Sequence, residues 1–562
     1  MRSGRGEEKG TPVLRRTITV FTLLLVTALS LPAAAAAARK DRRAGDVVPG
    51  SYIVVYKDSA GSVNRETDER ELRKGFKSRF RYGRALKGFS ARLSDRQLAE
   101  LRADPEVDYI TPNRTVRATA ALTTGELVPT GIGRMLAATP NPAGSANVPS
   151  SVGVAVIDTG IDLGHGDLNA ADGANCITPG TAAQDDNGHG THVAGTIAGE
   201  NDGAGVVGVA PGTRVHAVKV LNAGGGGTWD QIICGINWVT AHTNDKNIKV
   251  ANMSLGGLGS SADNGTCGNT TALHDAICNS TAAGVRYAVA AGNDAWAYPH
   301  PTLPDVPASY DEVLAVTASS DSDGNASGVG APPTCRTGEI DERYATFSNW
   351  SDNATDNAHT LAAPGVCIRS TWPRSLAPAG GYHTISGTSM ASPHVAGAVA
   401  RCIGELAADG SPVAGPCAGS TAPAEIIPNV TSTAIGYGFC GAPNQQPVSG
   451  RYYGYEALAG PSPSANFALC ASPSSRTVSR GKSTTYAVSI ARASGFTGAV
   501  SLSVSGLPSG ATATFSPNPT SSTSSTLTIR TTSRASKGTV TLTIKGVNGS
   551  IVRGTSVKLQ VK

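Results

Sequence analysis

Residues 384–401 of this 562-residue chain read TISGTSMASPHVAGAVAR. Gly387 allows a tight turn, and Pro393 fits only the first turn of a helix, where its missing N–H is no loss. The small apolar residues that follow predict a helix buried closely against its neighbours. Ser389 would lie at the N-terminus of that helix, where unpaired N–H groups and the helix dipole stabilise a developing oxyanion. Taken alone, this serine is explained more simply as a helix N-cap.

Two earlier stretches change that interpretation. Residues 152–160 read VGVAVIDTG, an apolar strand that stops at Asp158 and a turn. Residues 187–199 read NGHGTHVAGTIAG and place His189 between glycines, just before a second helix of small residues. The order Asp, His, Ser is one of the few chain orders in which the Ser-His-Asp catalytic triad has arisen on unrelated folds. The three stretches together therefore favour a triad.

Three segments resemble the three signature motifs of the subtilisin family of serine proteases: 158–160, 189–196 and 387–394. The resemblance implies hydrolysis of peptide bonds through an acyl-enzyme. Ser389 would be the nucleophile, His189 its general base, and Asp158 the group that holds the imidazole in the correct tautomer. These reactions need no cofactor.

Further segments resemble the substrate-binding parts of the family. Asn293, which follows the apolar run 285–291, resembles the oxyanion-hole asparagine. Two stretches resemble the edges that pair with an extended substrate: Ser254, Leu255, Gly256 and Gly257 on one side, and Gly225, Gly227 and Trp229 on the other. No acid is clearly placed to select basic side chains, so we expect broad specificity with a preference for apolar or aromatic residues. The two other motif histidines, His192 and His394, are interpreted as packing residues.

The central part of the chain predicts an α/β fold. Apolar strand runs alternate with helical segments of small residues; the strands are 152–157, 215–221, 248–253, 285–291 and 313–318, and the helices 189–199, 228–242, 271–283 and 389–408. This alternation predicts a parallel sheet with helices on both faces, as the family resemblance also implies. Asp158 directly follows a strand, at the carboxyl edge where such sheets bind ligands.

The first two segments of the chain predict export and inhibition. Residues 1–38 combine basic residues, an apolar run too short for a membrane span and an alanine-rich stretch, which is typical of a signal peptide. We therefore expect a secreted, extracellular protein without a transmembrane anchor after signal removal. Residues 39–121 resemble the subtilisin propeptide, a small α+β unit that inhibits its own enzyme. Its tail, residues 116–121, would lie in the active site and be cut there.

The last two segments differ sharply in charge. Residues 122–460 are assigned to the peptidase domain; from residue 121 to 460 there are 12 basic and 28 acidic side chains. Residues 461–562 are rich in serine and threonine, carry 11 basic and no acidic side chains, and contain period-two runs typical of an immunoglobulin-like β-sandwich. This tail could bind an anionic surface, dock on the acidic domain or act as a spacer, the simplest of the three.

The cysteines and acids predict disulfides and leave calcium open. The ten cysteines show no C-x-x-C spacing with histidines, so we expect disulfides rather than zinc. Cys267 and Cys278 are close enough for a local loop, whereas the other pairings stay open. Structural calcium is possible, but Thr360 stands where several relatives carry a calcium-ligating aspartate. Four other acids are interpreted as solvated loop residues: Asp185, Asp186, Asp321 and Asp323.

The expected partners are protein and peptide substrates and the chain's own propeptide, and we expect a monomer. Nucleic acid is not expected, because the tail's aromatic residues Tyr486, Phe496 and Phe515 occupy core positions rather than a stacking face. The alternative function is an inactive protease fold that serves as a secreted binding protein. That reading needs a broken triad or oxyanion hole, and neither is visible in the sequence.

Overall fold

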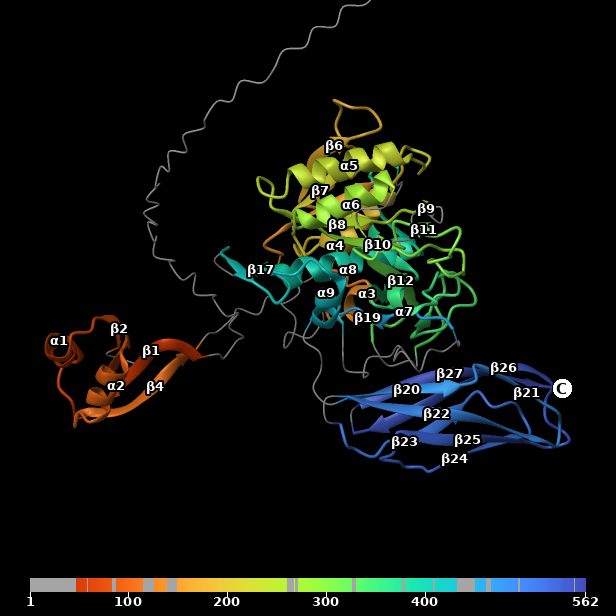
Figure 1. The fold of residues 1–562 in the computed structure, drawn as a ribbon. Helices are drawn as coiled ribbons and strands as arrows, with labels where there is room; N and C mark the ends of the chain where they lie inside the picture. The colour runs from red at the N-terminus through yellow and green to blue at the C-terminus, as the bar shows by residue number, and fades with distance from the viewer. Residues whose placement is uncertain are drawn as a thin grey trace, which may run out of the picture.

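The computed structural model contains three folded units that follow one another along the chain (Figure 1). It describes residues 47–57, 59–82, 87–114, 126–138, 149–259, 267, 271–325, 330–376, 380–407, 410–431, 450–460, 466–493, 496–549 and 551–562. The segments predicted as signal peptide and as the cleaved propeptide tail lie outside these described residues.

The N-terminal unit is the small α+β fold expected from the sequence. Its antiparallel sheet has the strand order β2-β3-β1-β4, with β1 (Val47–Tyr56), β2 (Ser78–Tyr82), β3 (Gly88–Arg92) and β4 (Val107–Arg114). Two helices pack against it, α1 (Val63–Lys74) and α2 (Asp95–Arg102). Helix α2 begins where Ser94 and Gln97 form a capping box. Val54, Phe89 and Leu101 are completely buried between sheet and helices.

The central unit is built on the expected parallel sheet. Eight strands lie in the order β19-β14-β12-β10-β8-β5-β7-β6, and every neighbouring pair is parallel. Their bounds are β5 (Gly153–Asp158), β6 (Ala170–Asn175), β7 (Val215–Lys219), β8 (Ile248–Met253), β10 (Arg286–Ala290), β12 (Leu314–Ser320), β14 (Thr360–Pro364) and β19 (Tyr455–Glu456). A short strand, β13 (Arg343–Tyr344), pairs antiparallel with β12.

Helices cover both faces of this sheet (Figure 1). One face packs against α4 (His189–Ala198) and α8 (Thr388–Ile403), and the other against α5 (Trp229–Ala241) and α6 (Ala272–Ala282). Successive side chains of β5 point into alternate cores: Val154 and Val156 into the first, Ala155 and Ile157 into the second. Burial on both faces explains why the sequence of this strand is continuously apolar.

Helix α8 ends earlier than the predicted segment 389–408. It stops at Ile403, and the next residues form β17 (Gly404–Leu406), which pairs with β18 (Pro412–Ala414). The backbone packs closely here, since a Cβ added to Gly404 would lie 2.3 Å from Ser151 Oγ. The remaining short elements of this unit are α3 (Thr130–Arg134), α7 (Ala354–Asn357), α9 (Pro423–Val430), β9 (Gly257–Leu258), β11 (Asp305–Val306), β15 (Ile368–Thr371) and β16 (Tyr382–Ile385).

The C-terminal unit is a β-sandwich, as expected. Its two four-stranded sheets have the orders β20-β22-β25-β24 and β21-β27-β26-β23. The strands are β20 (Asn466–Ser472), β21 (Ser475–Val478), β22 (Ser483–Ala493), β23 (Ser501–Ser505), β24 (Ala511–Ser516), β25 (Ser524–Thr531), β26 (Gly538–Asn548) and β27 (Ile551–Val561). Tyr486 and Phe496 are buried between the sheets, and Phe515 packs against the same core.

Disulfides tie the central unit together. The described residues include the pairs Cys176–Cys234, Cys267–Cys278, Cys335–Cys367 and Cys402–Cys417. The Cys267–Cys278 pair is the local loop that the sequence predicts, whereas the other three close loops of 15 to 58 residues. No helix in the described part of the chain is long and apolar enough to cross a membrane.

Candidate active site

The ends of two elements bring Asp158 and His189 together. Asp158 is the last residue of β5, and its side chain is completely buried. His189 is the first residue of α4 and follows Gly188, whose φ of 109° favours glycine. The Nδ1–H of His189 donates to Asp158 Oδ1 at 2.8 Å, and Oδ2 lies 3.0 Å away. The strand end and the helix start therefore orient the imidazole.

The histidines of the motifs differ in their electrostatic surroundings. Burial lowers the pKa of His189, but the charge of Asp158 and its hydrogen bond raise that pKa by more, so it lies above its ordinary value. Burial lowers the pKa of His192 to about 3 and that of His394 to about 4. Both side chains are completely buried and neutral, and His192 Nε2 donates to the Ile368 carbonyl at 3.0 Å. Both histidines are buried in the interior, as their interpretation as packing residues predicts.

Ser389 lies in the first turn of α8, but the prediction for Pro393 is wrong. The helix begins at Thr388, so Pro393 lies inside it rather than in its first turn. Without an N–H, Pro393 cannot donate to the Ser389 carbonyl. The Ser254 hydroxyl donates to that carbonyl instead, at 2.7 Å. The Ser389 hydroxyl donates to the Ser254 carbonyl at 3.2 Å rather than to His189.

Asp185 holds the loop that precedes His189, and its interpretation as a solvated acid is wrong. Its side chain is almost completely buried. The carboxylate accepts hydrogen bonds from the Gly188 N–H at 2.9 Å and from the Thr191 hydroxyl at 2.6 Å. It also accepts one from the Thr159 hydroxyl at 2.8 Å. Asp185 thus ties the end of β5 to the start of α4.

Asn293, which the sequence predicts as an oxyanion-hole residue, lies beside the N-terminus of α8. Its Oδ1 accepts hydrogen bonds from the Thr388 N–H at 2.8 Å and from the Thr388 hydroxyl at 3.1 Å. A Cβ added to Gly387 would lie 3.6 Å from both Asn293 Nδ2 and the Ser389 backbone N. These two donors therefore border one common space.

Sequence analysis missed Asn349, which positions the Asn293 loop. Its buried amide donates to the Ala291 carbonyl at 2.9 Å and accepts from the Asp294 N–H at 2.9 Å. The same amide donates to Asp305 at 2.7 Å, and burial raises the pKa of that carboxyl to about 6. No local motif marks Asn349, because its partners are 44 to 58 residues away in the sequence.

A cleft of about 400 Å³ opens beside His189. Its lining includes all seven residues predicted to contact substrate: Ser254, Leu255, Gly256, Gly257, Gly225, Gly227 and Trp229. Four apolar side chains also line the cleft: Leu221, Ile232, Leu273 and Val306. Among the described residues that line this cleft there is no Asp, Glu, Lys or Arg. The cleft can therefore hold an extended chain with an apolar side chain.

Three acidic residues lie near the loop 199–206: Glu126, Asp167 and Asp202. Asp167 is nearly buried, and burial, together with the charges of Glu126 and Asp202, raises its pKa to about 7. Glu126 Oε2 accepts from the Gly203 N–H at 3.0 Å, but its buried Oε1 has no hydrogen-bond partner among the described residues. However, these three carboxylates, all in the described part of the chain, do not form a group whose oxygens all lie within 4.8 Å of one another. Asp167 also accepts from the Val206 N–H at 3.0 Å and from the Glu200 N–H at 3.1 Å, so this trio fits a cation poorly.

A second group of acids fits a cation better. Oxygens of Asp321, Asp323 and Asp341 lie within 4.8 Å of one another. Asp321 accepts from the Gly324 N–H at 3.1 Å and Asp341 from the Gly330 N–H at 2.9 Å, but each carboxylate keeps further lone pairs for a hard cation such as calcium. The four acids interpreted as solvated divide evenly: Asp186 and Asp323 are exposed, whereas Asp185 and Asp321 are buried.

Comparison with known proteins identifies the family. The profile of the Subtilase family matches residues 150–432, half of the chain. The chain belongs to the subtilase family. A second profile, Peptidase inhibitor I9, matches residues 51–119, which cover the N-terminal unit. This subtilase is a subtilisin-like serine endopeptidase with an N-terminal inhibitor propeptide.

Several subtilisins resemble this subtilase over most of their length. Subtilisin E of Bacillus subtilis (strain 168) is 35% identical over 384 residues, which cover 68% of this chain and 85% of that protein. The Extracellular serine proteinase of Thermus sp. (strain Rt41A) is 36% identical over 382 residues, 64% of this chain and 81% of that protein. Subtilisin-like serine protease Pen ch 13 of Penicillium rubens is 34% identical over 374 residues, 63% and 82% of the two chains.

Proposed function

We propose that this subtilase is a secreted, self-processed endopeptidase that cleaves proteins with the triad Asp158, His189 and Ser389. The observation that carries the proposal is the Asp158–His189 hydrogen bond of 2.8 Å, placed beside a cleft that both substrate edges line. Ser389 contacts one of those edges directly, through its two hydrogen bonds with Ser254.

The proposed chemistry follows the geometry. The Ser389 hydroxyl turns from the Ser254 carbonyl to His189 Nε2, which takes its proton as Ser389 attacks the scissile carbonyl. Asp158 holds the imidazole and stabilises the imidazolium that forms. The Ser389 N–H and Asn293 Nδ2 donate to the oxyanion of the tetrahedral intermediate. His189 then protonates the leaving amine, and water hydrolyses the acyl-enzyme by the same path.

The lining of the cleft supports broad specificity with an apolar or aromatic preference. An extended substrate would add a strand between residues 225–227 and 254–257, where bare glycines expose the backbone. The neighbouring wall is apolar, and Trp229 is 38% exposed at its rim. A charged side chain would lose its water there without gaining a partner of opposite charge, which costs free energy.

The domain boundaries stand as part of the proposal: signal peptide 1–38, inhibitory propeptide 39–121, peptidase domain 122–460 and β-sandwich 461–562. Secretion is supported by the extracellular relative from Thermus and by the disulfides, which form in oxidising compartments. The maturation bond is proposed to lie near residue 121, between the inhibitor unit and the first described residues of the peptidase.

Calcium is proposed as a structural ion, without a part in the chemistry. Asp321, Asp323 and Asp341 would hold it, because their carboxylate oxygens lie within 4.8 Å of one another. Bound there, the ion would tie the loop after β12 to the segment 330–342.

The test is self-processing. We expect secreted wild-type protein to lose the segment before about residue 122, and Ser389→Ala to keep residues 39–121, because the nucleophile is missing. Intact-mass measurement reports both, in a host without other proteases. As the control, a trace of mature wild-type enzyme should cut the Ser389→Ala precursor, which shows that the bond stays accessible.

Two outcomes would contradict the proposal. Cleavage of Ser389→Ala at the wild-type bond in a protease-free system would exclude autoprocessing. Failure of a sulfonyl fluoride to label Ser389 in the wild-type protein would favour an inactive binding protein instead.

A further inference from the structure

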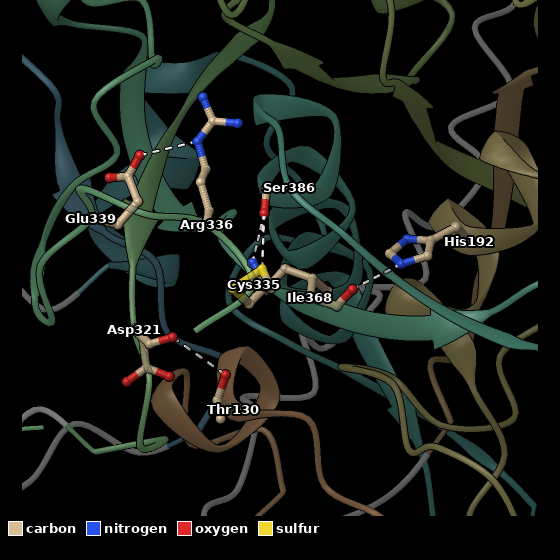
Figure 2. Close-up of a disulfide and its surroundings, with 9 residues drawn as sticks. Thr130, His192, Asp321, Cys335, Arg336, Glu339, Ile368 and Ser386 are labelled. Carbon is tan, nitrogen blue, oxygen red and sulfur yellow. Dashed lines mark hydrogen bonds and ion pairs between the residues drawn. A yellow bond between two sulfur atoms is a disulfide. The ribbon is translucent and has the colours of Figure 1, made fainter. Parts of the chain in front are cut away.

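Ser386, three residues before Ser389, contacts a disulfide. Figure 2 shows the Cys335–Cys367 bond directly beside Ser386. The Cys367 N–H donates to Ser386 Oγ at 2.9 Å, and Cys335 Sγ lies 3.7 Å from the same oxygen. Cys335 is exposed and Cys367 half-buried, so solvent reaches this bridge.

The segment that leads to Ser389 is fixed at consecutive positions. Ile368, the first residue of β15, pairs with Ile385, the last residue of β16. The hydrogen bond from the Cys367 N–H to the Ser386 side chain links the residues just beyond this pair. The Gly387 N–H then donates to the Gly365 carbonyl at 2.8 Å. Because α8 and its Ser389 N–H begin immediately afterwards, a shift of this segment would displace an oxyanion donor.

The backbone conformation of Cys367 is unfavourable by itself and requires stabilising contacts. Its φ is 57°, in the left-handed region that costs free energy for any residue with a Cβ. Two interactions hold it there, the bond to Cys335 and the hydrogen bond to Ser386. Without the disulfide, Cys367 can relax toward an ordinary φ, which would withdraw its N–H from Ser386.

The other end of the bridge is anchored near the oxyanion loop. Cys335 lies in the segment 330–342, where Glu339 bonds to Arg336 at 3.2 Å (Figure 2) and to the Thr346 N–H at 2.9 Å. Thr346 lies three residues before Asn349, which holds the Asn293 loop. The disulfide therefore joins the segment that leads to Ser389 to the segment 330–342, which is linked to the Asn293 loop through Thr346 and Asn349.

We propose that Ser386 and the Cys335–Cys367 disulfide are positioning residues for Ser389, so that opening this one disulfide lowers turnover without weakening ground-state substrate binding. The inference rests on the proposed function, since it takes Ser389 as the nucleophile. Misplacing the oxyanion donors affects the transition state more than the bound substrate, so kcat falls while KM stays nearly constant.

The test compares variants of the mature enzyme on a soluble peptide substrate. The variants are Ser386→Ala, Ser386→Thr, and the double variant Cys335→Ala with Cys367→Ala. The matched control is Cys402→Ala with Cys417→Ala, which opens a disulfide at the opposite end of α8. Active-site titration with a sulfonyl fluoride fixes the enzyme concentration, and circular dichroism checks the fold.

We expect Ser386→Ala to lower kcat about fivefold, the effect of one hydrogen bond. The Cys335/Cys367 double variant should lower kcat about 10- to 100-fold, as small misplacements of catalytic groups do. KM should change less than about twofold in both, in keeping with a transition-state effect. Ser386→Thr, which keeps the hydroxyl, should restore kcat, and the Cys402/Cys417 control should lower thermal stability but keep kcat.

The proposal is overturned if the Ser386 and Cys335/Cys367 variants lower kcat no more than the control, or if their loss is found in KM alone. If the double cysteine variant does not fold or mature, the Ser386→Ala and Ser386→Thr pair, which keeps the disulfide, decides. Failure of the proposed function is distinguishable, because the wild-type enzyme itself would then resist labelling by the sulfonyl fluoride.

Discussion

In the proposed mechanism, His189 determines how activity depends on pH. The nucleophile is activated only by the neutral imidazole, and the charge of Asp158 raises the pKa of His189 above about 6.5. We therefore expect kcat/KM to rise with pH through an apparent pKa above about 6.5 and to be lost in acid. A pH profile with a small peptide substrate measures this. An apparent pKa below that value would mean that burial outweighs Asp158.

The matched variant is Asp158→Asn, which removes the charge and keeps the shape. Its apparent pKa should fall below that of the wild type, and kcat should fall as well, because the imidazolium loses its stabilising partner. The raised pKa of His189 also makes the free energy of unfolding depend on pH. A raised His pKa stabilises the folded chain below about pH 6.5, and this contribution is lost as pH rises through the folded pKa. The enzyme thus becomes active as this contribution disappears.

The residues proposed to act in catalysis were easier to predict than the residues that position them. Asp158, His189 and Ser389 lie within long local motifs, so sequence alone indicates them. Asp185 and Asn349 act through buried hydrogen bonds to loops that only the folded sheet brings near, and no local pattern encodes such partners. Pro393 cannot donate to the Ser389 carbonyl, and Ser254 donates to it instead. This role of Ser254 could be inferred only after the structure showed that α8 begins at Thr388 and contains Pro393.

At the scale of elements, the small residues of α8 set how closely it packs. A Cβ added to Gly397 would lie 2.7 Å from Val209 Cβ, an atom fixed directly to the backbone. Gly397→Ala gains about 1 kcal/mol of helix propensity, but overpacking costs about 1–3 kcal/mol, and the clash should win since Val209 cannot rotate away. We expect a Tm lower by about 3 °C, measured by differential scanning calorimetry.

Gly419→Ala is the matched control, because Gly419 is exposed and no atom lies within 4 Å of its added Cβ. It should leave Tm nearly unchanged. An equal or higher Tm for Gly397→Ala would show that α8 can shift on the sheet, and that its small residues do not fix the packing.

The sequence predicted the helices and strands whose residues follow one clear hydrophobic pattern. Five of the six inner strands of the central sheet correspond to the five predicted apolar runs, whereas the sixth, β14, was not predicted. The edge strand β6 has the sequence AADGAN, which lacks the apolar pattern of a strand, so the sequence did not predict it. Helix α1 was not predicted either, because it is almost entirely polar. Helix α8 ends before its predicted bound because residues 404–406 form β17, which bonds to Pro149 and Ser151, far earlier in the sequence.

At the scale of the whole molecule, the boundary between peptidase and sandwich is set by separate cores. The sandwich core contains residues 467–561 only, and neither core of the central sheet includes any of them. By contrast, β19 (Tyr455–Glu456) belongs to the parallel sheet, and Glu456 is buried there with Ser319 as its hydrogen-bond donor. The independent peptidase should therefore extend through residue 460 and no less.

Two truncations test that boundary. A chain that ends at residue 460 keeps every strand of the parallel sheet, so we expect kcat/KM on a small peptide within about twofold of the full chain. A chain that ends at residue 450 lacks β19 and exposes the edge of β14, so it should fail to fold or lose several degrees in Tm. Peptide kinetics and calorimetry on both chains measure these outcomes. If the chain that ends at residue 460 were inactive, the basic sandwich would be part of the catalytic fold. Its 11 basic and no acidic side chains would then indicate that it docks on the acidic peptidase domain.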